Sequence, residues 1–202
     1  MKLKRTLICL SLVTGLQLAS AQERLSREET LKYAFLVSAD LKQLQGTPIP
    51  TDVDLKRPVA MRDGEFGGMI LPEARLSAEA IAKAGDKVMA VGQLWLLKLT
   101  PMHDGNAISE SQLRVIKLSH EGDEVQVPQC ALGVRRAASG GLELLVYGKA
   151  AEPLFAVPLK AIDGKEQPGI DLDADRDSSA GHLTLTLAGK YRAKLDVTQL
   201  EL

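Results

Sequence analysis

The clearest pattern in this sequence lies at its C-terminal end, where apolar and polar residues alternate. Leu183, Leu185 and Leu187 alternate with threonines, and a second alternating run follows at 191–198. A period of two is typical of a β-strand with one buried face. The two runs therefore predict a β-hairpin, and a three-residue loop at 188–190 keeps the apolar residues of both strands on the same face.

Residues 88–99 predict a second kind of strand, because apolar residues occupy both the even-numbered and the odd-numbered positions of this stretch. Leu94 and Leu96 share one parity, whereas Trp95 and Leu97 share the other. Apolar side chains on both faces are typical of a central strand that is covered on both sides.

Turn residues divide much of the remaining chain into short strands. Asp63 and Gly64 separate apolar runs at 58–62 and 66–71, which is a strong local signal for a hairpin. Further strands are expected at 112–119, 124–134, 141–147 and 153–160. Within the second of these, the apolar parity changes around Pro128, and this change predicts a β-bulge.

The N-terminal part of the chain predicts a helix. Ser26 and Glu29 have the spacing of a capping box, and Gly46 and Pro48 are stop signals, so the helix is expected at 27–45. Its apolar stripe consists of Leu31, Ala34, Phe35, Leu41 and Leu44. The stripe either packs on the rest of the domain or makes the helix a free arm for a partner. Packing is favoured, because exposed apolar residues would promote association.

A second, shorter helix is expected after Ser77, which is placed to cap it, and before Gly85, which is placed to end it. Leu76 and Ile81 stand at the two positions of a hydrophobic staple. The span covers only about two turns, so tertiary packing must hold the helix in place.

Together these elements predict a mainly β fold, with an antiparallel β-sandwich or partly open barrel of about 8–9 strands. An N-terminal α-helix and one short inserted helix complete it. The expected organisation is a signal peptide at 1–21, an N-terminal helix and extended linker at 22–56, and a β-sandwich domain at 57–202.

The first 21 residues have the features of a cleaved signal peptide. Three basic residues precede an apolar run at 7–18, and Ala19, Ser20 and Ala21 fit the small-x-small cleavage rule. The apolar run has only about a dozen residues, whereas a bilayer span needs about 20. We therefore expect the protein to be exported to the periplasm or the extracellular space.

Removal of this peptide changes the charge and the cysteine count. The mature chain has 22 basic and 26 acidic residues, a formal net charge of −4. This balance argues against non-specific binding to nucleic acid or anionic membranes. Cys130 becomes the only cysteine, so an intramolecular disulfide is impossible. Its apolar neighbours predict a small buried hydrophobe, while an intermolecular link or a reactive thiol is the alternative.

The most suggestive polar cluster consists of Asp171, Asp173, Asp175 and Asp177. Carboxylates at alternate positions are candidate ligands for calcium, which takes six to eight oxygens. The spacing departs from a calcium-binding loop, because Ser178 stands where the sharp-turn glycine belongs. The alternative is an exposed acidic loop before the last hairpin. Calcium is the one cofactor that the sequence offers as a candidate.

No catalytic residue is predicted. His103, His120 and His182 each stand alone in a turn or at a strand edge, without the spacing of metal ligands, and solvent exposure is expected for each. The sequence also lacks a serine-nucleophile motif.

The sequence therefore predicts an exported, non-catalytic β-sandwich protein that serves as a binding or assembly module of the cell envelope. A protein partner is favoured over a small molecule, without nucleic acid and without a transmembrane segment after signal cleavage. Two alternatives stay open. One is a calcium- or small-ligand-binding module that uses Asp171–Asp177, and the other is a hydrolase whose carboxylates come together only in the fold.

Overall fold

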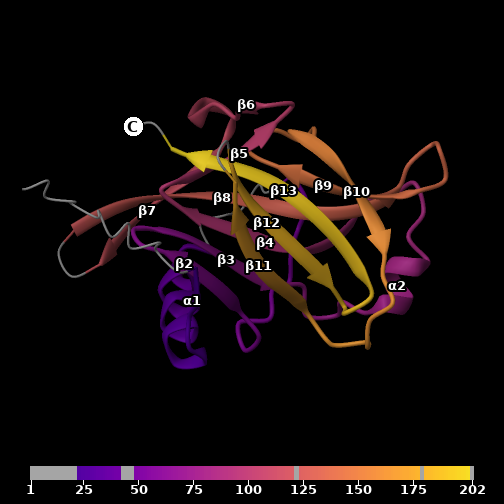
Figure 1. Ribbon diagram of the computed structural model, residues 1–202, viewed down its shortest axis with the longest axis horizontal. Coiled ribbons are helices and arrows are strands. Elements are labelled where there is room, and N and C mark those ends of the chain that lie inside the picture. The colour runs from indigo at the N-terminus through magenta and orange to yellow at the C-terminus, as the bar shows by residue number, and fades with distance from the viewer. Residues whose placement is uncertain (1–21, 42–47, 121–122, 178–179, 201–202) are drawn as a thin grey trace, which may run out of the picture.

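The computed structural model describes residues 22–41, 48–120, 123–177 and 180–200, and the predicted signal peptide at 1–21 lies outside these ranges. Within them the protein is mainly β. An antiparallel sheet curls into a half-barrel and two α-helices accompany it (Figure 1). The predicted fold class is therefore confirmed.

The described ranges contain more strands than the sequence predicts, because several are short. The helices are α1 (Arg27–Leu41), α2 (Ala78–Ala82) and the 3₁₀ turn η1 (Glu110–Gln112). The strands are β1 (Glu23–Arg24), β2 (Val59–Asp63), β3 (Phe66–Pro72), β4 (Met89–Leu97), β5 (Leu99–His103), β6 (Asn106–Ala107), β7 (Arg114–His120), β8 (Asp123–Arg136), β9 (Leu142–Tyr147), β10 (Phe155–Ala161), β11 (Ile170–Arg176), β12 (Gly181–Leu187) and β13 (Tyr191–Gln199).

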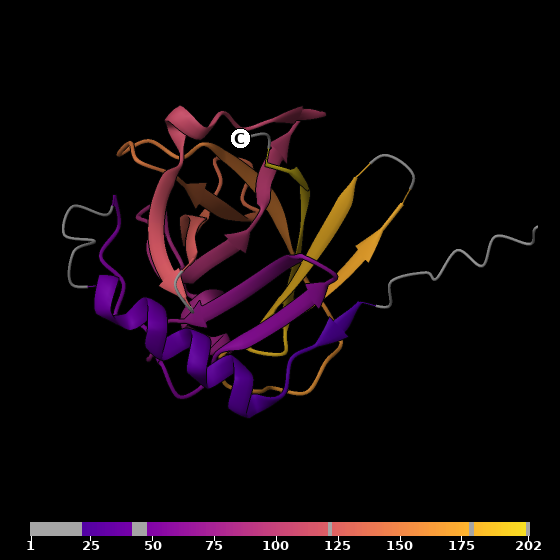
Figure 2. The same cartoon turned by 90° about the vertical axis from the view of Figure 1, so that its left-hand side faces the viewer.

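The strands form one continuous path in the order β1-β2-β3-β4-β8-β9-β10-β13-β12-β11. Off this path, β7 pairs with β8, and β5 pairs with both β13 and β6. The path curls until its two ends meet. Arg24 of β1 forms an ion pair with Asp171 of β11 and donates a hydrogen bond of 3.4 Å to the carbonyl of Leu172. Figure 2 shows this curvature, with α1 running along the outside of the sheet.

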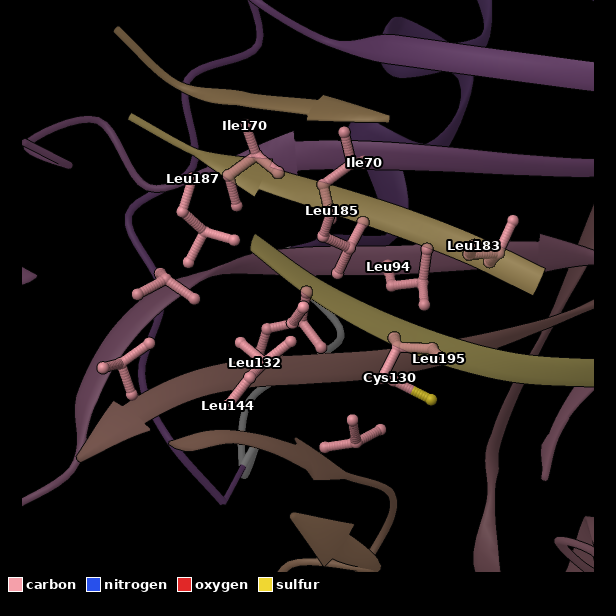
Figure 3. Packing of buried hydrophobic residues seen from close by; sticks show 14 of the residues in the cluster. Ile70, Leu94, Cys130, Leu132, Leu144, Ile170, Leu183, Leu185, Leu187 and Leu195 are labelled. Atoms are coloured by element: carbon pink, nitrogen blue, oxygen red, sulfur yellow. The ribbon is translucent and has the colours of Figure 1, made fainter. Parts of the chain in front are cut away.

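The inside of the curl holds the main hydrophobic core (Figure 3). The hairpin β12–β13 contributes to it as the alternation predicts, since Leu183, Leu185 and Leu187 are all buried. Leu187 pairs directly with Tyr191 across residues 188–190. This register confirms the three-residue loop, and it keeps the apolar side chains of both strands in the core.

Strand β4 is covered on both faces, which confirms the prediction from its apolar residues. Leu94 and Leu96 point into the main core and are fully buried. Trp95 points the other way, into a second hydrophobic cluster on the outer face of the sheet.

The β-bulge predicted near Pro128 is wrong. Strand β8 pairs continuously with β7 through this residue. Val127 faces the outer cluster, whereas Cys130 faces the main core. The apolar parity changes because the two ends of β8 are covered on opposite faces. A register shift does occur in β4, between Ala90 and Gly92.

Helix α1 packs on the sheet, which decides between the two alternatives for this segment. Ala34 and Val37 are buried in the outer cluster. The predicted capping box is confirmed, since the Glu29 N–H donates to the Ser26 hydroxyl at 3.3 Å and the Ser26 N–H donates to the Glu29 carboxylate at 3.2 Å. Residues 42–45 of the predicted helix lie outside the described ranges.

The short helix α2 forms where the sequence predicts it. The Ala80 N–H donates to the hydroxyl of Ser77 at 3.1 Å, which caps the helix. Leu76 and Ile81 are both buried, as a hydrophobic staple requires. Across the described parts of the chain, no helix combines the length and the apolar character that crossing a membrane requires.

Gly189, in the β12–β13 loop, generates a prediction about stability. Its φ is +67°, and a Cβ at this position would overlap the carbonyl oxygen of Lys165. We expect Gly189→Ala to lower the free energy of unfolding by about 2–4 kcal/mol, because left-handed backbone and steric overlap both raise the energy of the folded state. Urea unfolding measures this difference.

Gly105→Ala is the matched control. Gly105 has a similar φ of +76°, but no atom lies within 4 Å of a Cβ built there. This variant should lose only about 1 kcal/mol, the backbone cost alone. Equal losses in the two variants would contradict the close approach at Gly189.

Candidate functional site

An apolar cleft of about 200 Å³ lies between α1 and the outer face of the sheet. Its walls come from α1, from the segment before it and from β2, β3, β4, β7 and β8. Its lining includes Tyr33 and Leu36 of α1 together with Met69, Trp95 and Val127 of the sheet. Arg62 and the Tyr33 hydroxyl are the main polar groups of the lining, so the interior is suited to an apolar group.

The cleft is hollow because Gly67, near the start of β3, has no side chain to fill the space. A Cβ built on Gly67 would lie 3.6 Å from the Cβ of Leu97, which lines the cleft. A Cβ on Gly68 would instead lie 3.8 Å from Leu172 and Leu183, on the core side of the sheet. Neither glycine has a positive φ. The backbone would therefore accept a Cβ at both positions, and the hollow arises from the side chain that is missing at Gly67.

Trp95 forms part of the cleft wall with its polar atom already satisfied. The indole Nε1–H donates to the Gln93 side-chain oxygen at 3.2 Å, and the Gln93 amide donates to the Thr51 hydroxyl at 2.6 Å. The side chain is 2% exposed, and it is the only tryptophan of the chain. Its fluorescence therefore reports on this cleft specifically.

Helix α1 leaves two aromatic side chains in solvent. Tyr33 is 38% exposed and Phe35 is 62% exposed, and no other large apolar side chain in the described ranges is classed as exposed. The prediction that Phe35 belongs to the buried stripe is wrong. The buried residues are Thr30, Ala34 and Val37, whose small or branched side chains face the sheet, and each residue turns the helix by about 100°. Phe35 therefore points away from the sheet.

The four aspartates proposed as calcium ligands do not lie in a loop. Asp171, Asp173 and Asp175 belong to strand β11 and alternate with inward-facing residues, and Asp177 follows the strand. Alternate side chains of a strand are about 6.6 Å apart, whereas calcium ligands all lie within about 2.6 Å of the ion. Among the described residues, no group of three or more acidic, histidine or cysteine side chains is placed to hold a metal ion. The calcium site stays a prediction.

Three of these carboxylates face a cationic side chain from another segment. The pairs are Asp171 with Arg24, Asp175 with Lys194 at 3.6 Å, and Asp177 with His182 at 2.9 Å. The acids therefore connect β11 to neighbouring segments of the half-barrel.

His182 is held between two carboxylates. Its Nε2 lies 2.9 Å from Asp177 and its Nδ1 lies 2.7 Å from Asp196, and the side chain is only 12% exposed. The expectation of a solitary, solvent-exposed histidine is wrong here, because the register of β12 with β13 places Asp196 directly opposite. The hydrogen bond to Asp177, aided by that to Asp196, raises the pKa of His182. With both ring nitrogens engaged, the imidazole has no nitrogen free to act as a base.

The remaining candidate groups have ordinary structural environments. Cys130 is fully buried, and this burial raises its pKa to about 12. The prediction of a small buried hydrophobe is confirmed, and at neutral pH the thiol stays protonated and unreactive. His103 is exposed, as predicted, and stacks on Phe155 with ring centroids 5.1 Å apart. The side chain of His120 lies outside the described residues.

The Asp177–His182–Asp196 arrangement predicts a pH-dependent stability. We expect His182→Asn to lower the free energy of unfolding by about 1–2 kcal/mol at pH 6, through the loss of charge-assisted hydrogen bonds. A pKa raised in the folded state means that this contribution is complete below the unfolded value of about 6.5 and disappears as the pH rises through the folded value. The loss should therefore be much smaller at pH 9. Urea unfolding at both pH values measures it, and an unchanged loss would show that the charge of His182 contributes nothing.

Comparisons of the chain with protein-family models, with curated proteins and with solved structures gave no match. The function is therefore inferred from the residues and geometry of the molecule itself.

Proposed function

We propose that this protein is an exported, non-catalytic binding module of the cell envelope that recognises a partner protein through the apolar cleft under α1. The observation that carries this proposal is the cleft itself, a hollow of about 200 Å³ with almost entirely apolar walls. Water gains few hydrogen bonds in such a space, so displacement of water by an apolar group favours binding.

The size of the cleft indicates what it receives. A cavity of about 150 Å³ holds a benzene molecule, whereas sites for drug-sized ligands have about 300–1,000 Å³. The cleft therefore suits one aromatic or branched aliphatic side chain, which a partner protein would insert as an anchor. A protein partner of this kind agrees with the preference drawn from the sequence.

The residues around the cleft are those that protein interfaces favour. Met69 gives it an adaptable wall, and Tyr33 and Arg62 stand among the lining residues. Arg62 is 45% exposed and pairs with Glu23 at 3.2 Å. An apolar centre beside exposed polar groups is the usual arrangement of an interface hot spot.

Two further features support the other parts of the proposal. The signal-like residues 1–21 support export, and an exported protein meets its partners in the cell envelope or outside the cell. The engaged nitrogens of His182 and the buried, protonated thiol of Cys130 support a binding role over catalysis by these groups.

Selection of random peptides displayed on phage, panned against the mature protein, tests the proposal. We expect the selected peptides to share one aromatic or branched aliphatic anchor and to change the fluorescence of Trp95 on binding. Gly67→Val should weaken this binding by at least about tenfold, equivalent to 1.4 kcal/mol, because its side chain enters the cleft.

Gly68→Val is the matched control, since it makes the same change at the adjacent position but on the core side of the sheet. It should retain the affinity, and both variants should keep a melting temperature close to that of the wild type, because valine suits a strand. Should Gly68→Val fail to fold, Gly68→Ala replaces it, since its Cβ makes only contacts of 3.8 Å. Peptides that bind Gly67→Val as tightly as the wild type would refute the cleft as the binding site.

A further inference from the structure

A second groove, of about 530 Å³, is lined by four segments that are far apart in the sequence. These are the residues around β1 and the start of α1, the segment before β2, the loop before β11, and the loop between β12 and β13. The cationic side chains that line it are Arg24, Arg27, Lys56, Arg57, Lys165 and Arg192. The only carboxylates of this lining are Asp171 and Asp173, so the groove has an excess of four positive charges. The whole chain, in contrast, has a formal net charge of −1.

Four of these cations form no direct ion pair in the described part of the chain, although Lys56 also lies within electrostatic range of Asp54. Arg27, Lys56, Lys165 and Arg192 form no side-chain ion pair or hydrogen bond with the described residues. Like charges gathered around one groove repel each other and raise the local positive potential. An anion in the groove would relieve this repulsion, whereas the same side chains scattered over the surface would not need one.

Backbone hydrogen bonds hold one wall of the groove in place. They join the loop before β11 to the β12–β13 loop, and they run from Gln167 N–H to Ala188 O at 3.2 Å, from Ala188 N–H to Gly169 O at 2.8 Å, and from Ile162 N–H to Lys190 O at 2.9 Å. Gly189 lets the two loops approach closely, because it has no Cβ to overlap the carbonyl of Lys165. The backbones that carry Lys165 and Arg192 are therefore positioned before any ligand arrives, which lowers the entropic cost of binding.

The lining also indicates the class of anion. Arginine guanidinium groups bind phosphate oxygens with two parallel hydrogen bonds, and lysine adds a compact positive charge. None of the described residues that line the groove is aromatic, so it offers no ring on which bases or sugars would stack. A single phosphate carries at most about two charges at neutral pH. Four free cations therefore match two adjacent phosphate groups better than one.

We propose that this groove binds a ligand with at least two adjacent phosphate groups, a diphosphate moiety. Recognition works through charge and hydrogen bonds to the phosphate oxygens, with Lys165 and Arg192 as principal contacts. This site is separate from the apolar cleft under α1, and neither proposal depends on the other.

Titration calorimetry of the mature protein with inorganic pyrophosphate, at about 50 mM NaCl, tests the proposal, because low salt preserves electrostatic binding. We expect saturable binding to one site. The double variant Lys165→Gln/Arg192→Gln should bind pyrophosphate at least about tenfold more weakly. Thermal unfolding should show that this variant remains folded, since both side chains are exposed and form no internal pair.

Arg75→Gln/Lys87→Gln is the matched control. It removes the same two charges from exposed positions that do not line the groove. Its affinity for pyrophosphate should equal that of the wild type. If the control weakens binding as much as the groove variant, the effect is general surface electrostatics and the proposal fails.

Co-sedimentation with vesicles distinguishes the source of the phosphates. Binding to vesicles that contain diacylglycerol pyrophosphate but not to pure phosphatidylcholine, lost in Lys165→Gln/Arg192→Gln, would support the groove and identify a lipid diphosphate headgroup as its ligand. Pyrophosphate binding without vesicle binding would identify a soluble ligand. Absence of both kinds of binding in the wild type would overturn the proposal.

Discussion

The apolar residues on both faces of β4 impose a constraint from which most of the architecture follows. Each such side chain gains about 1.5–3 kcal/mol when it is fully buried, so neither face can remain in water. The curled sheet covers Leu94 and Leu96 on the inside, and α1 covers Trp95 on the outside. Helix α1 therefore lies across the outer face of the sheet, and the short strand before it, β1, pairs with β2. That pairing brings Arg24 to β11 and closes the two ends of the sheet path.

The outer cover is incomplete, and this is where the candidate site arises. The small side chains of the buried face of α1 allow the helix to approach the sheet, but Gly67 leaves no side chain to fill the space beneath it. A valine there would have suited a strand and filled the hollow. The fold would gain packing from such a residue, so the empty space has no evident structural benefit. A binding role is the explanation that we favour, and the exposed Phe35 on the same helix makes the surface of α1 a further region for contact.

Some features follow from the sequence alone because they depend on neighbours within a few residues. The alternation at 183–197 sets the strands and the register of β12 and β13, since a slip by one residue would expose the leucines. Ser26 and Glu29 start α1 through hydrogen bonds within a single turn. The two apolar parities of β4 require cover on both faces, and this requirement is local too. Two predictions that failed, the bulge at Pro128 and the buried Phe35, depended on which distant element covers which face.

The β-rich class, the main hairpins and the starts of the helices can therefore be predicted from the sequence, because strand alternation and capping are short-range. Tertiary structure alone decided the sites. His182 meets its two carboxylates through the register of β12 with β13 and the turn after β11, and no spacing in the sequence marks this arrangement. The cations of the groove proposed to bind a diphosphate come from positions as distant as Arg24 and Arg192, in a chain whose overall charge is negative. Electrostatics and cavities depend on distances in space, and only the closing of the curled sheet brings these residues together.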